Sequence, residues 1–301
     1  MGRITDLGWR VTGRFVTVPP VTALPAGRMT ELAGRGSTYL VDTGPPASGR
    51  DDAPTLILLH ALACTGLLSW YPSLAALSAR YRVIIFDQRW HGRGIRSPHF
   101  ALDDLADDTV AVADALGVDR FVPVGYSMGA LVAQLVAHRR PDRVDGLVLG
   151  ASTMRFRRGE AEPLALRLLA YRIGLIAERK LRGGPLSAPL ADVSDANRWA
   201  LGQFRSTSKS EILGATAVLA RFDSTPWVHQ LTVPASVVIT LRDHAIPVAY
   251  QRALVRALPD ATAFEIDSGH AAVVLDAERF RPALLAACAS VSARRHALGR
   301  P

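Results

Sequence analysis

The five residues Gly125-Tyr126-Ser127-Met128-Gly129 carry the most specific structural signal in this chain. It follows the apolar run 120–124 and precedes the helix-like segment 130–137. A serine in a sharp strand-to-helix turn has strained backbone angles, and glycines two positions away on either side let the strand and the helix approach without Cβ clashes. The Ser127 hydroxyl is then exposed at the helix N-terminus, where the backbone N–H of Met128 can stabilise an oxyanion. The stretch therefore predicts a nucleophile elbow.

Apolar runs alternate with helical segments along most of the chain. Continuous apolar strands between helices are typical of a parallel sheet that is covered on both faces, so the sequence predicts an α/β fold with a mostly parallel, doubly wound sheet. The segments 28–32 and 37–41 predict an antiparallel hairpin at the edge of this sheet. Strands are predicted at 55–59, 81–86, 121–124, 146–149, 236–239 and 263–266. Helices are predicted at about 67–79, 103–117, 128–139, 247–257 and 275–291.

The alternation stops between about 154 and 230, where an arginine cluster and further helical segments follow a strand end. A helical insertion at that place would lie over the carboxyl edge of the sheet, where ligands bind in open α/β folds. We therefore expect a cap or lid. The predicted organisation is an N-terminal arm over 1–27, a core formed by 28–153 and 231–301, and a helical cap over 154–230.

Two further residues could complete a site around the serine. A serine nucleophile needs a base that takes its proton and a third group that orients the base. Asp243 follows the predicted strand 236–239, and His270 follows the predicted strand 263–266. Ser127, Asp243 and His270 thus occur in the order nucleophile, acid, base, each at the end of a strand.

Other carboxylates are weaker candidates for the acid. Asp267 lies too close in sequence to His270 to reach the far ring nitrogen, so a structural role is expected for it. The segment 150–154, which follows another strand end, contains no carboxylate. Both observations favour Asp243, although an aspartate in such a loop can also be a simple turn residue.

The loop after the strand 55–59 is expected to supply a second oxyanion donor, the backbone N–H of Leu62, beside that of Met128. His60 is expected to hold this loop by hydrogen bonds, and Cys64 to pack. Four side chains are candidates for substrate contacts: Ala61, Trp90, Tyr126 and Phe156.

Composition excludes several classes of protein. The chain has 301 residues and a formal charge of +8, but lysine occurs only at Lys180 and Lys209, the arginines are spread along the chain, and no nucleic-acid-binding motif accompanies them. Two cysteines favour a reduced, cytoplasmic setting. No apolar run approaches the roughly 18 residues that span a bilayer, and no secretory signal is evident, so stable membrane insertion is not expected. The sequence leaves the oligomeric state open, a homodimer included.

Together these residues resemble the α/β-hydrolase superfamily, close to soluble bacterial, serine-esterase-like α/β-fold hydrolases with a helical cap. The resemblance covers roughly 29–290 and implies Ser127 as nucleophile, His270 as base, Asp243 as orienting acid, and no metal or organic cofactor. The family usually has His-Gly where this chain has His60-Ala61, so an added Cβ could narrow the oxyanion loop. The matching segments are 58–60, 87–94, 125–129, Asp243 and 269–270.

Serine at the elbow favours acyl chemistry, because dehalogenases and epoxide hydrolases of this fold use aspartate there. The leading hypothesis is hydrolysis of a carboxylic ester of a small molecule through an acyl-enzyme on Ser127. Thioesters, lactones, C–C bonds and perhydrolysis are compatible with the same residues. The alternatives are an acyltransferase and a hydrolase-like small-molecule binding protein with little turnover.

Overall fold

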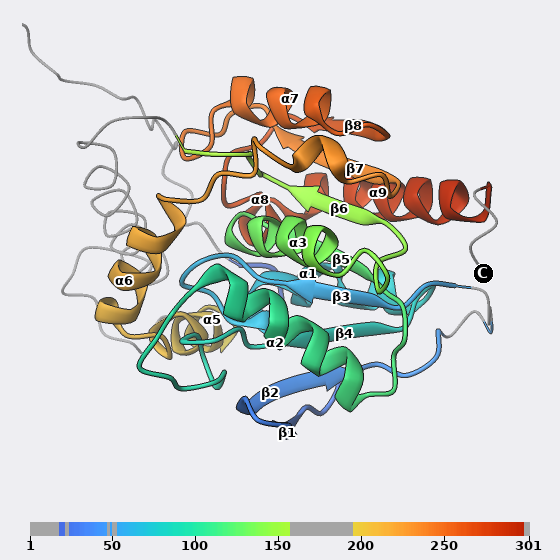
Figure 1. Ribbon diagram of the computed structural model, residues 1–301. Helices are drawn as coiled ribbons and strands as arrows, with labels where there is room; N and C mark the ends of the chain where they lie inside the picture. Colours follow the sequence, from blue (N-terminus) through green and yellow to red (C-terminus); the bar gives the residue numbers. More distant parts are fainter. Residues whose placement is uncertain (1–17, 22–23, 47–48, 50–52, 157–194, 298–301) are drawn as a thin grey trace, which may run out of the picture.

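The computed structural model describes residues 18–21, 24–46, 49, 53–156 and 195–297 (Figure 1). The described strands form one sheet in the order β1-β2-β4-β3-β5-β6-β7-β8. The hairpin β1–β2 and the pair β2–β4 are antiparallel, and every other pair is parallel. The strands are β1 Arg28–Leu32, β2 Gly36–Asp42, β3 Leu56–Leu59, β4 Val83–Phe86, β5 Val122–Tyr126, β6 Leu147–Gly150, β7 Ala235–Thr240 and β8 Ala261–Ile266.

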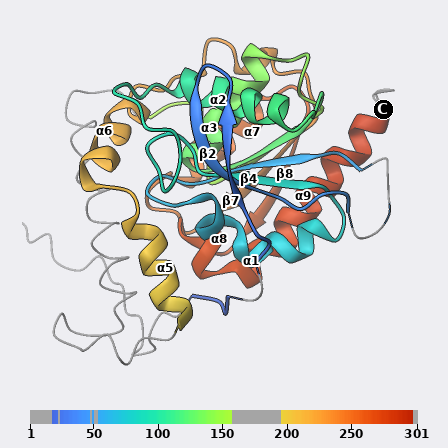
Figure 2. The same ribbon diagram turned by 90° about the horizontal axis from the view of Figure 1, so that it is seen from below.

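Helices cover both faces of the sheet (Figures 1 and 2). Successive side chains of a strand point to opposite faces, so Ile57 and Leu59 of β3 pack in the cluster that holds α2 and α3, while Leu56 and Leu58 pack with α1 and α9. Double burial explains why the strands are continuous apolar runs. The described helices are α1 Gly66–Ser78, α2 Leu102–Ala115, α3 Met128–Arg139, α5 Asp195–Arg205, α6 Lys209–Leu219, η2 Val228–Gln230, α7 Val248–Ala257, α8 Ala272–Leu275 and α9 Ala277–Ala297.

The predicted fold class is confirmed, and the predicted hairpin lies at the sheet edge. The helix predicted at about 275–291 corresponds to α9, but it begins two residues later, at Ala277, and extends to Ala297. The chain breaks at Asp276, whose extended φ of −134° ends α8. The Asp276 carbonyl accepts from the N–H of Phe280 at 3.0 Å, as the residue before a helix does, so α9 starts anew after it.

Two helices of the predicted cap, α5 and α6, lie between β6 and β7 in sequence and beside the carboxyl ends of the strands in space (Figure 1). The Thr65 hydroxyl, at the start of α1, donates to the Gln203 side chain of α5 at 2.8 Å. The Gly92 N–H donates to the Thr207 hydroxyl, between α5 and α6, at 3.1 Å. These bonds fasten the two helices to loops at that edge. The rest of the predicted helical insertion, 157–194, lies outside the described residues.

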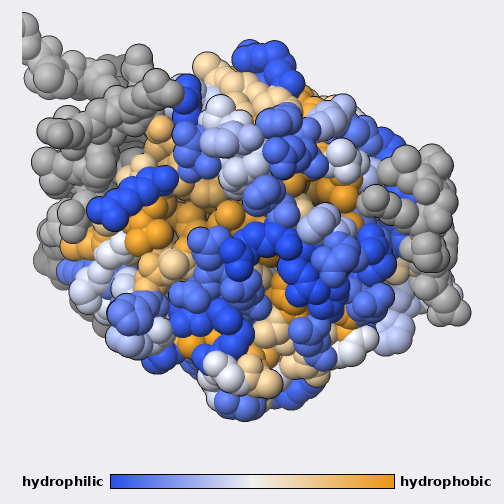
Figure 3. All heavy atoms as spheres, viewed as in Figure 1, coloured by the Kyte–Doolittle hydropathy of each residue, from blue (hydrophilic) through white to orange (hydrophobic). Residues whose placement is uncertain are grey.

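The described part of the N-terminal arm lies against the body of the protein. The Tyr71 hydroxyl of α1 donates to the Pro19 carbonyl at 2.8 Å, and the Val18 N–H donates to the Asn197 side chain of α5 at 3.0 Å. The surface seen in Figure 3 is mainly hydrophilic, with hydrophobic residues gathered on the side of α6. Among the described helices none combines the length and apolar character that a bilayer crossing requires.

Candidate active site

Ser127 lies at the turn between β5 and α3, with φ 52° and ψ −115°. The two glycines beside it are required by close approach of the backbone. A Cβ on Gly125 would lie 2.2 Å from the Gly129 carbonyl oxygen, and one on Gly129 would lie 2.1 Å from the Leu59 carbonyl oxygen of β3. A positive φ at a non-glycine residue is sterically costly, so the packing of strand and helix holds Ser127 in this conformation. The local geometry is that of the elbow predicted from the sequence.

The structure brings Ser127, His270 and Asp243 into one hydrogen-bonded chain. Ser127 Oγ lies 2.9 Å from His270 Nε2, and His270 Nδ1 lies 2.8 Å from Asp243 Oδ2. A carboxylate can only accept, so the imidazole proton is on Nδ1 and Nε2 is left to accept the serine proton. The His270 side chain is 23% exposed and that of Asp243 is 0% exposed. The His270 side chain therefore reaches solvent and that of Asp243 does not.

Asp243 is held as a carboxylate by its surroundings. Burial opposes its charge, but the hydrogen bond and charge of His270, together with the Ile246 N–H and the Thr240 hydroxyl, outweigh burial and lower the pKa of Asp243 below its usual value. Oδ1 also accepts from the N–H groups of Ala245 and Ile246, both at 2.8 Å. An ionised Asp243 at neutral pH can stabilise a positive charge on His270.

The predicted oxyanion donors lie on neighbouring segments. Met128 is the first residue of α3, so its N–H has no acceptor within the helix. Leu62 is half-buried in the loop after β3. The backbone of Gly129 closely approaches the carbonyls of Leu59 and His60, at the end of β3. The start of α3 therefore lies beside the loop that carries Leu62.

His60 holds the loop after β3 by hydrogen bonds, as the sequence predicts. Its Nδ1 lies 2.8 Å from the Ala61 carbonyl, and its Nε2 accepts from the Gln88 N–H at 2.9 Å. Burial lowers the pKa of His60 to about 4, which the bond to Ala61 only partly offsets. His60 is therefore neutral near pH 7 and acts as a fixed support. Cys64 is half-buried, and the loss of hydration around its thiol raises the pKa to about 11 despite the hydrogen bond to Ser69, so the thiol is protonated near pH 7.

Two of the candidate substrate contacts are committed to packing. Tyr126 is 0% exposed, and its hydroxyl donates to the His270 carbonyl at 2.9 Å, so it supports the loop that carries His270. The half-buried Trp90 donates from Nε1 to the Ser97 carbonyl at 2.7 Å. A Cβ on Gly214 would lie 2.9 Å from the Trp90 ring, so this ring packs against α6.

The other two candidates, Ala61 and Phe156, are half-buried. Ala61 precedes Leu62 in the oxyanion loop, and its carbonyl accepts from Cys64 as well as from His60. Phe156 follows β6 and packs against the hydrophobic cluster on the α2–α3 side of the sheet. Both residues therefore stand at the carboxyl edge of the sheet, where a ligand of this fold would bind.

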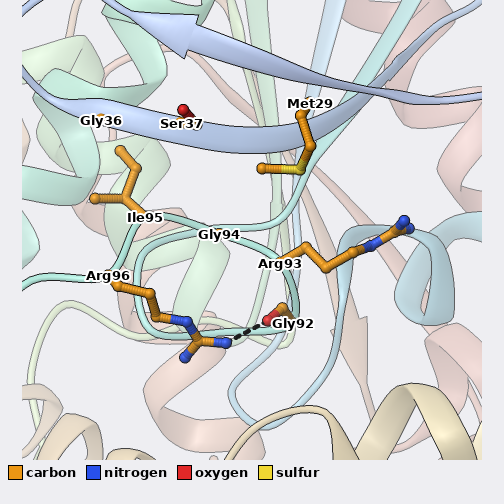
Figure 4. A pocket seen from close by; sticks show the side chains of 8 residues that line it. All are labelled: Met29, Gly36, Ser37, Gly92, Arg93, Gly94, Ile95 and Arg96. Carbon is orange, nitrogen blue, oxygen red and sulfur yellow. Dashed lines mark hydrogen bonds between the residues drawn. The ribbon is translucent and has the colours of Figure 1, made fainter.

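Asp87, directly after β4, joins its own loop to the start of α1. Its carboxylate accepts from the Gly66 N–H at 2.8 Å and from the Arg93 N–H at 2.9 Å. A cavity of about 500 Å³ lies on the outer side of this loop (Figure 4). None of the serine, histidine and aspartate of the candidate site lines it. Its lining residues are Met29, Gly36, Ser37, Gly92, Arg93, Gly94, Ile95 and Arg96.

Two buried polar residues beside Asp243 were not singled out from the sequence. Thr240 ends β7 and Gln251 lies in α7, and both are 0% exposed. No sequence motif joins them to Asp243, because their contacts arise only when α7 folds back on the end of β7. A threonine directly before the acid loop was the only available signal. Within the described residues, no group of three or more His, Cys, Asp or Glu side chains could hold a metal ion.

The chain matches the family model of the α/β hydrolase fold over residues 54–277, most of its length. It belongs to the α/β hydrolase family. The resemblance inferred from the sequence is thereby confirmed. Two relatives, both named "Putative carbamate hydrolase RutD", are similar to this hydrolase. That of Agrobacterium fabrum is 28% identical over 252 residues, covering 79% of this chain and 94% of the relative. That of Escherichia coli is 29% identical over 266 residues, covering 82% and 95%.

Solved structures show the same fold for this hydrolase. A thermophilic esterase from Thermogutta terrifontis superposes with a TM-score of 0.69 and 24% identity, covering 90% of this chain and 100% of that one. The enol-lactonase from Burkholderia xenovorans LB400 superposes with a TM-score of 0.69 and 24% identity, covering 86% and 98%. These similarities extend over nearly the whole of each neighbour.

Proposed function

We propose that this hydrolase cleaves carboxylic esters or related acyl compounds of small molecules through an acyl-enzyme on Ser127. The observation that carries the proposal is the continuous path from Ser127 Oγ through His270 to Asp243, with links of 2.9 and 2.8 Å. A serine hydroxyl is a weak nucleophile unless a base takes its proton, and a base acts best when a third group fixes its orientation. Each requirement has a matching side chain.

The proposed reaction has two halves. Ser127 Oγ attacks the substrate carbonyl while its proton passes to His270 Nε2, and Asp243 stabilises the resulting imidazolium. The N–H groups of Leu62 and Met128 donate to the tetrahedral oxyanion. The ester C–O bond breaks as His270 returns the proton to the leaving alcohol, which yields the acyl-enzyme. His270 then takes a proton from water as the water oxygen attacks the acyl carbon. The bond between the acyl carbon and Ser127 Oγ breaks, His270 returns the proton to Oγ, and the acid is released.

A second candidate is hydrolysis of a carbamate, favoured by the similarity to the RutD proteins over about four fifths of the chain. A carbamate carries the same kind of carbonyl, with nitrogen on one side, so the same residues would act. Acyl transfer, perhydrolysis and C–C bond hydrolysis would also use this path. They differ in the bond that breaks or in the molecule that attacks the acyl-enzyme.

The test is a set of initial rates with p-nitrophenyl esters from acetate to palmitate and with a p-nitrophenyl carbamate. Ser127→Ala is expected to lower kcat by at least about 10⁴-fold, as for other serine nucleophiles. Ser78→Ala, which removes an exposed hydroxyl at the end of α1, is the matched control and should keep the wild-type rate. Retention of activity within tenfold in Ser127→Ala would refute the nucleophile assignment.

The substrate classes separate in the same assay. A rate on the carbamate above that on every ester would favour the second candidate. Added alcohols that yield a new ester would demonstrate acyl transfer. A folded wild type that turns over none of these compounds would favour a small-molecule binding protein.

A further inference from the structure

Two buried side chains, Thr240 and Gln251, lie beside the Asp243 carboxylate. The Thr240 hydroxyl lies 2.7 Å from Asp243 Oδ2, the same oxygen that meets His270. Gln251 Nε2 lies 3.0 Å from Thr240 Oγ1. Both residues are 0% exposed, so these groups have no access to bulk water and depend on one another for hydrogen bonds. The path from the serine thus continues beyond the aspartate to α7.

The direction of each bond in this extension is fixed by its neighbours. Gln251 Oε1 accepts from the Thr240 N–H at 3.1 Å, and Gln251 Nε2 donates to the Ile246 carbonyl at 2.8 Å. If the amide were turned over, its NH₂ group would face the Thr240 N–H and its oxygen would face the Ile246 carbonyl, so only the orientation described satisfies both neighbours. The remaining amide hydrogen then points to Thr240 Oγ1. The Thr240 hydroxyl contacts Gln251 Oε1 only at 3.4 Å. Its own hydrogen is therefore directed to Asp243.

The Asp243 carboxylate is saturated by this arrangement. Oδ1 accepts from two backbone N–H groups, those of Ala245 and Ile246, and Oδ2 accepts from Thr240 and His270. Four donors fill the roughly four lone-pair directions of an ionised carboxylate. The plane of the carboxylate is then determined, and Oδ2 can aim at the imidazole in one orientation only. Removal of the Thr240 donor leaves Oδ2 held by the histidine alone, apart from a long 3.4 Å contact with Gln251.

We propose that Thr240 and Gln251 are positioning residues of the reaction, which act through Asp243 to set the orientation of His270. This inference rests on the proposed function. The backbone amides fix only Oδ1, so they permit the carboxylate to tilt about that oxygen. The directed hydroxyl of Thr240 prevents the tilt, and Gln251 directs the hydroxyl. Orientation of the base matters most when charge develops on it, so the effect belongs to kcat and not to substrate binding.

The test replaces the hydroxyl without changing the volume of the side chain. Thr240→Val is expected to lower kcat about tenfold and to leave KM within about twofold, since a hydrogen bond to a charged group is lost. Thr240→Ser keeps the hydroxyl and should restore kcat to within about twofold of the wild type. Thr109→Val is the matched control, because Thr109 is also 0% exposed and its hydroxyl donates to the Leu105 carbonyl of its own helix at 2.8 Å, away from the candidate site.

Gln251→Leu should lower kcat in the same way. The double variant Thr240→Val/Gln251→Leu should have a kcat within about threefold of that of Thr240→Val alone, because both changes break the same hydrogen-bonded path. Additive losses would overturn the shared path. So would a Thr240→Val variant as active as Thr109→Val, or one that loses activity only through KM. If Gln251→Leu fails to fold, the three threonine variants still decide the matter.

A spectroscopic readout separates this inference from the proposed function. The hydrogen-bonded Nδ1 proton of His270, assigned by its loss in His270→Ala, should give a proton NMR resonance that moves in Thr240→Val and stays in place in Thr240→Ser and Thr109→Val. An unmoved resonance in Thr240→Val would overturn the positioning role. A wild type that turns over no acyl substrate would refute the proposed function, while the resonance would still report whether Thr240 orients the pair.

Discussion

Substitution of Gly129 by alanine tests the packing that exposes Ser127. The added Cβ would lie 2.1 Å from the Leu59 carbonyl oxygen, 2.4 Å from its carbon and 2.9 Å from the His60 carbonyl oxygen. An ordinary contact needs more than about 3 Å, so α3 and β3 must separate by about 1 Å. All three atoms belong to the backbone, and β3 is paired on both sides, so it yields only at the expense of the sheet. Overpacking of this kind costs about 3 kcal/mol.

The expected results are a lower melting temperature and a lower rate. A loss of about 3 kcal/mol corresponds to a fall in Tm of roughly 6 °C or more. A 1 Å displacement of the nucleophile corresponds to about a 100-fold fall in kcat/KM. Thermal unfolding and ester hydrolysis are measured on the same samples. Gly202→Ala is the control. Gly202 is exposed in α5, the described residues outside the helix's own backbone place no atom within 4 Å of the added Cβ, and alanine stabilises a helix by about 1 kcal/mol.

The comparison of the two glycine variants decides the argument. Gly202→Ala should keep its rate and should melt at the wild-type temperature or slightly above it. A Gly129→Ala variant with a Tm within 1 °C or so of the wild type and a rate within about threefold would refute the reasoning, because the helix would then not rest on the β3 carbonyls.

The remaining predictions concern pH, the histidine loop and the oxyanion loop. The pKa of His60 is about 4 in the folded protein, against 6.5 for a free histidine, so the unfolded chain binds a proton first as the pH falls. The free energy of unfolding should therefore fall by about 2 kcal/mol from pH 7 to pH 5. In denaturant titrations His60→Asn should reduce this pH dependence, and His99→Gln, at an exposed histidine, should not. Tyr126→Phe, which removes the hydrogen bond to the His270 carbonyl, should cost about 1 kcal/mol of stability in the same titrations, and an unchanged midpoint would show that this bond contributes nothing. Ala61→Gly removes the Cβ beside the predicted oxyanion donors and should raise the rate on long acyl chains relative to acetate, whereas an unchanged chain-length profile would place Ala61 away from the acyl group.

The sequence predicted most of this fold because each strand is a continuous apolar run and each candidate residue follows a strand end. Ser127, Asp243 and His270 could be placed together without coordinates, since parallel strands carry their loops to one edge. Side-chain direction could not be predicted in the same way. Tyr126 was a candidate substrate contact, but its ring packs edge-on against Phe280 at 5.2 Å and is fully buried.

Contacts between elements far apart in sequence were equally inaccessible. The ring of Trp90 lies against α6 only because Gly214 presents no side chain there, and nothing near Trp90 in the sequence indicates this. The Thr240–Gln251 pair likewise depends on the angle at which α7 returns along β7. The break at Asp276 could have been recognised, because aspartate is a preferred residue at the start of a helix.

The helical insertion divides the candidate site along the chain. Ser127 and the loop after β3 precede it in the sequence, and Asp243 and His270 follow it. The strands that flank the insertion, β6 and β7, pair directly with each other, from Leu147 opposite Ala235 to Gly150 opposite Val238. During synthesis Ser127 therefore emerges long before His270, and a chain truncated ahead of His270 lacks the residue that the proposed function requires to take the serine proton. Pairing of β7 with β6 places the loop that carries Asp243, and pairing of β8 with β7 places the loop that carries His270. Under the proposed function, activity therefore appears only when the last strand has joined the sheet.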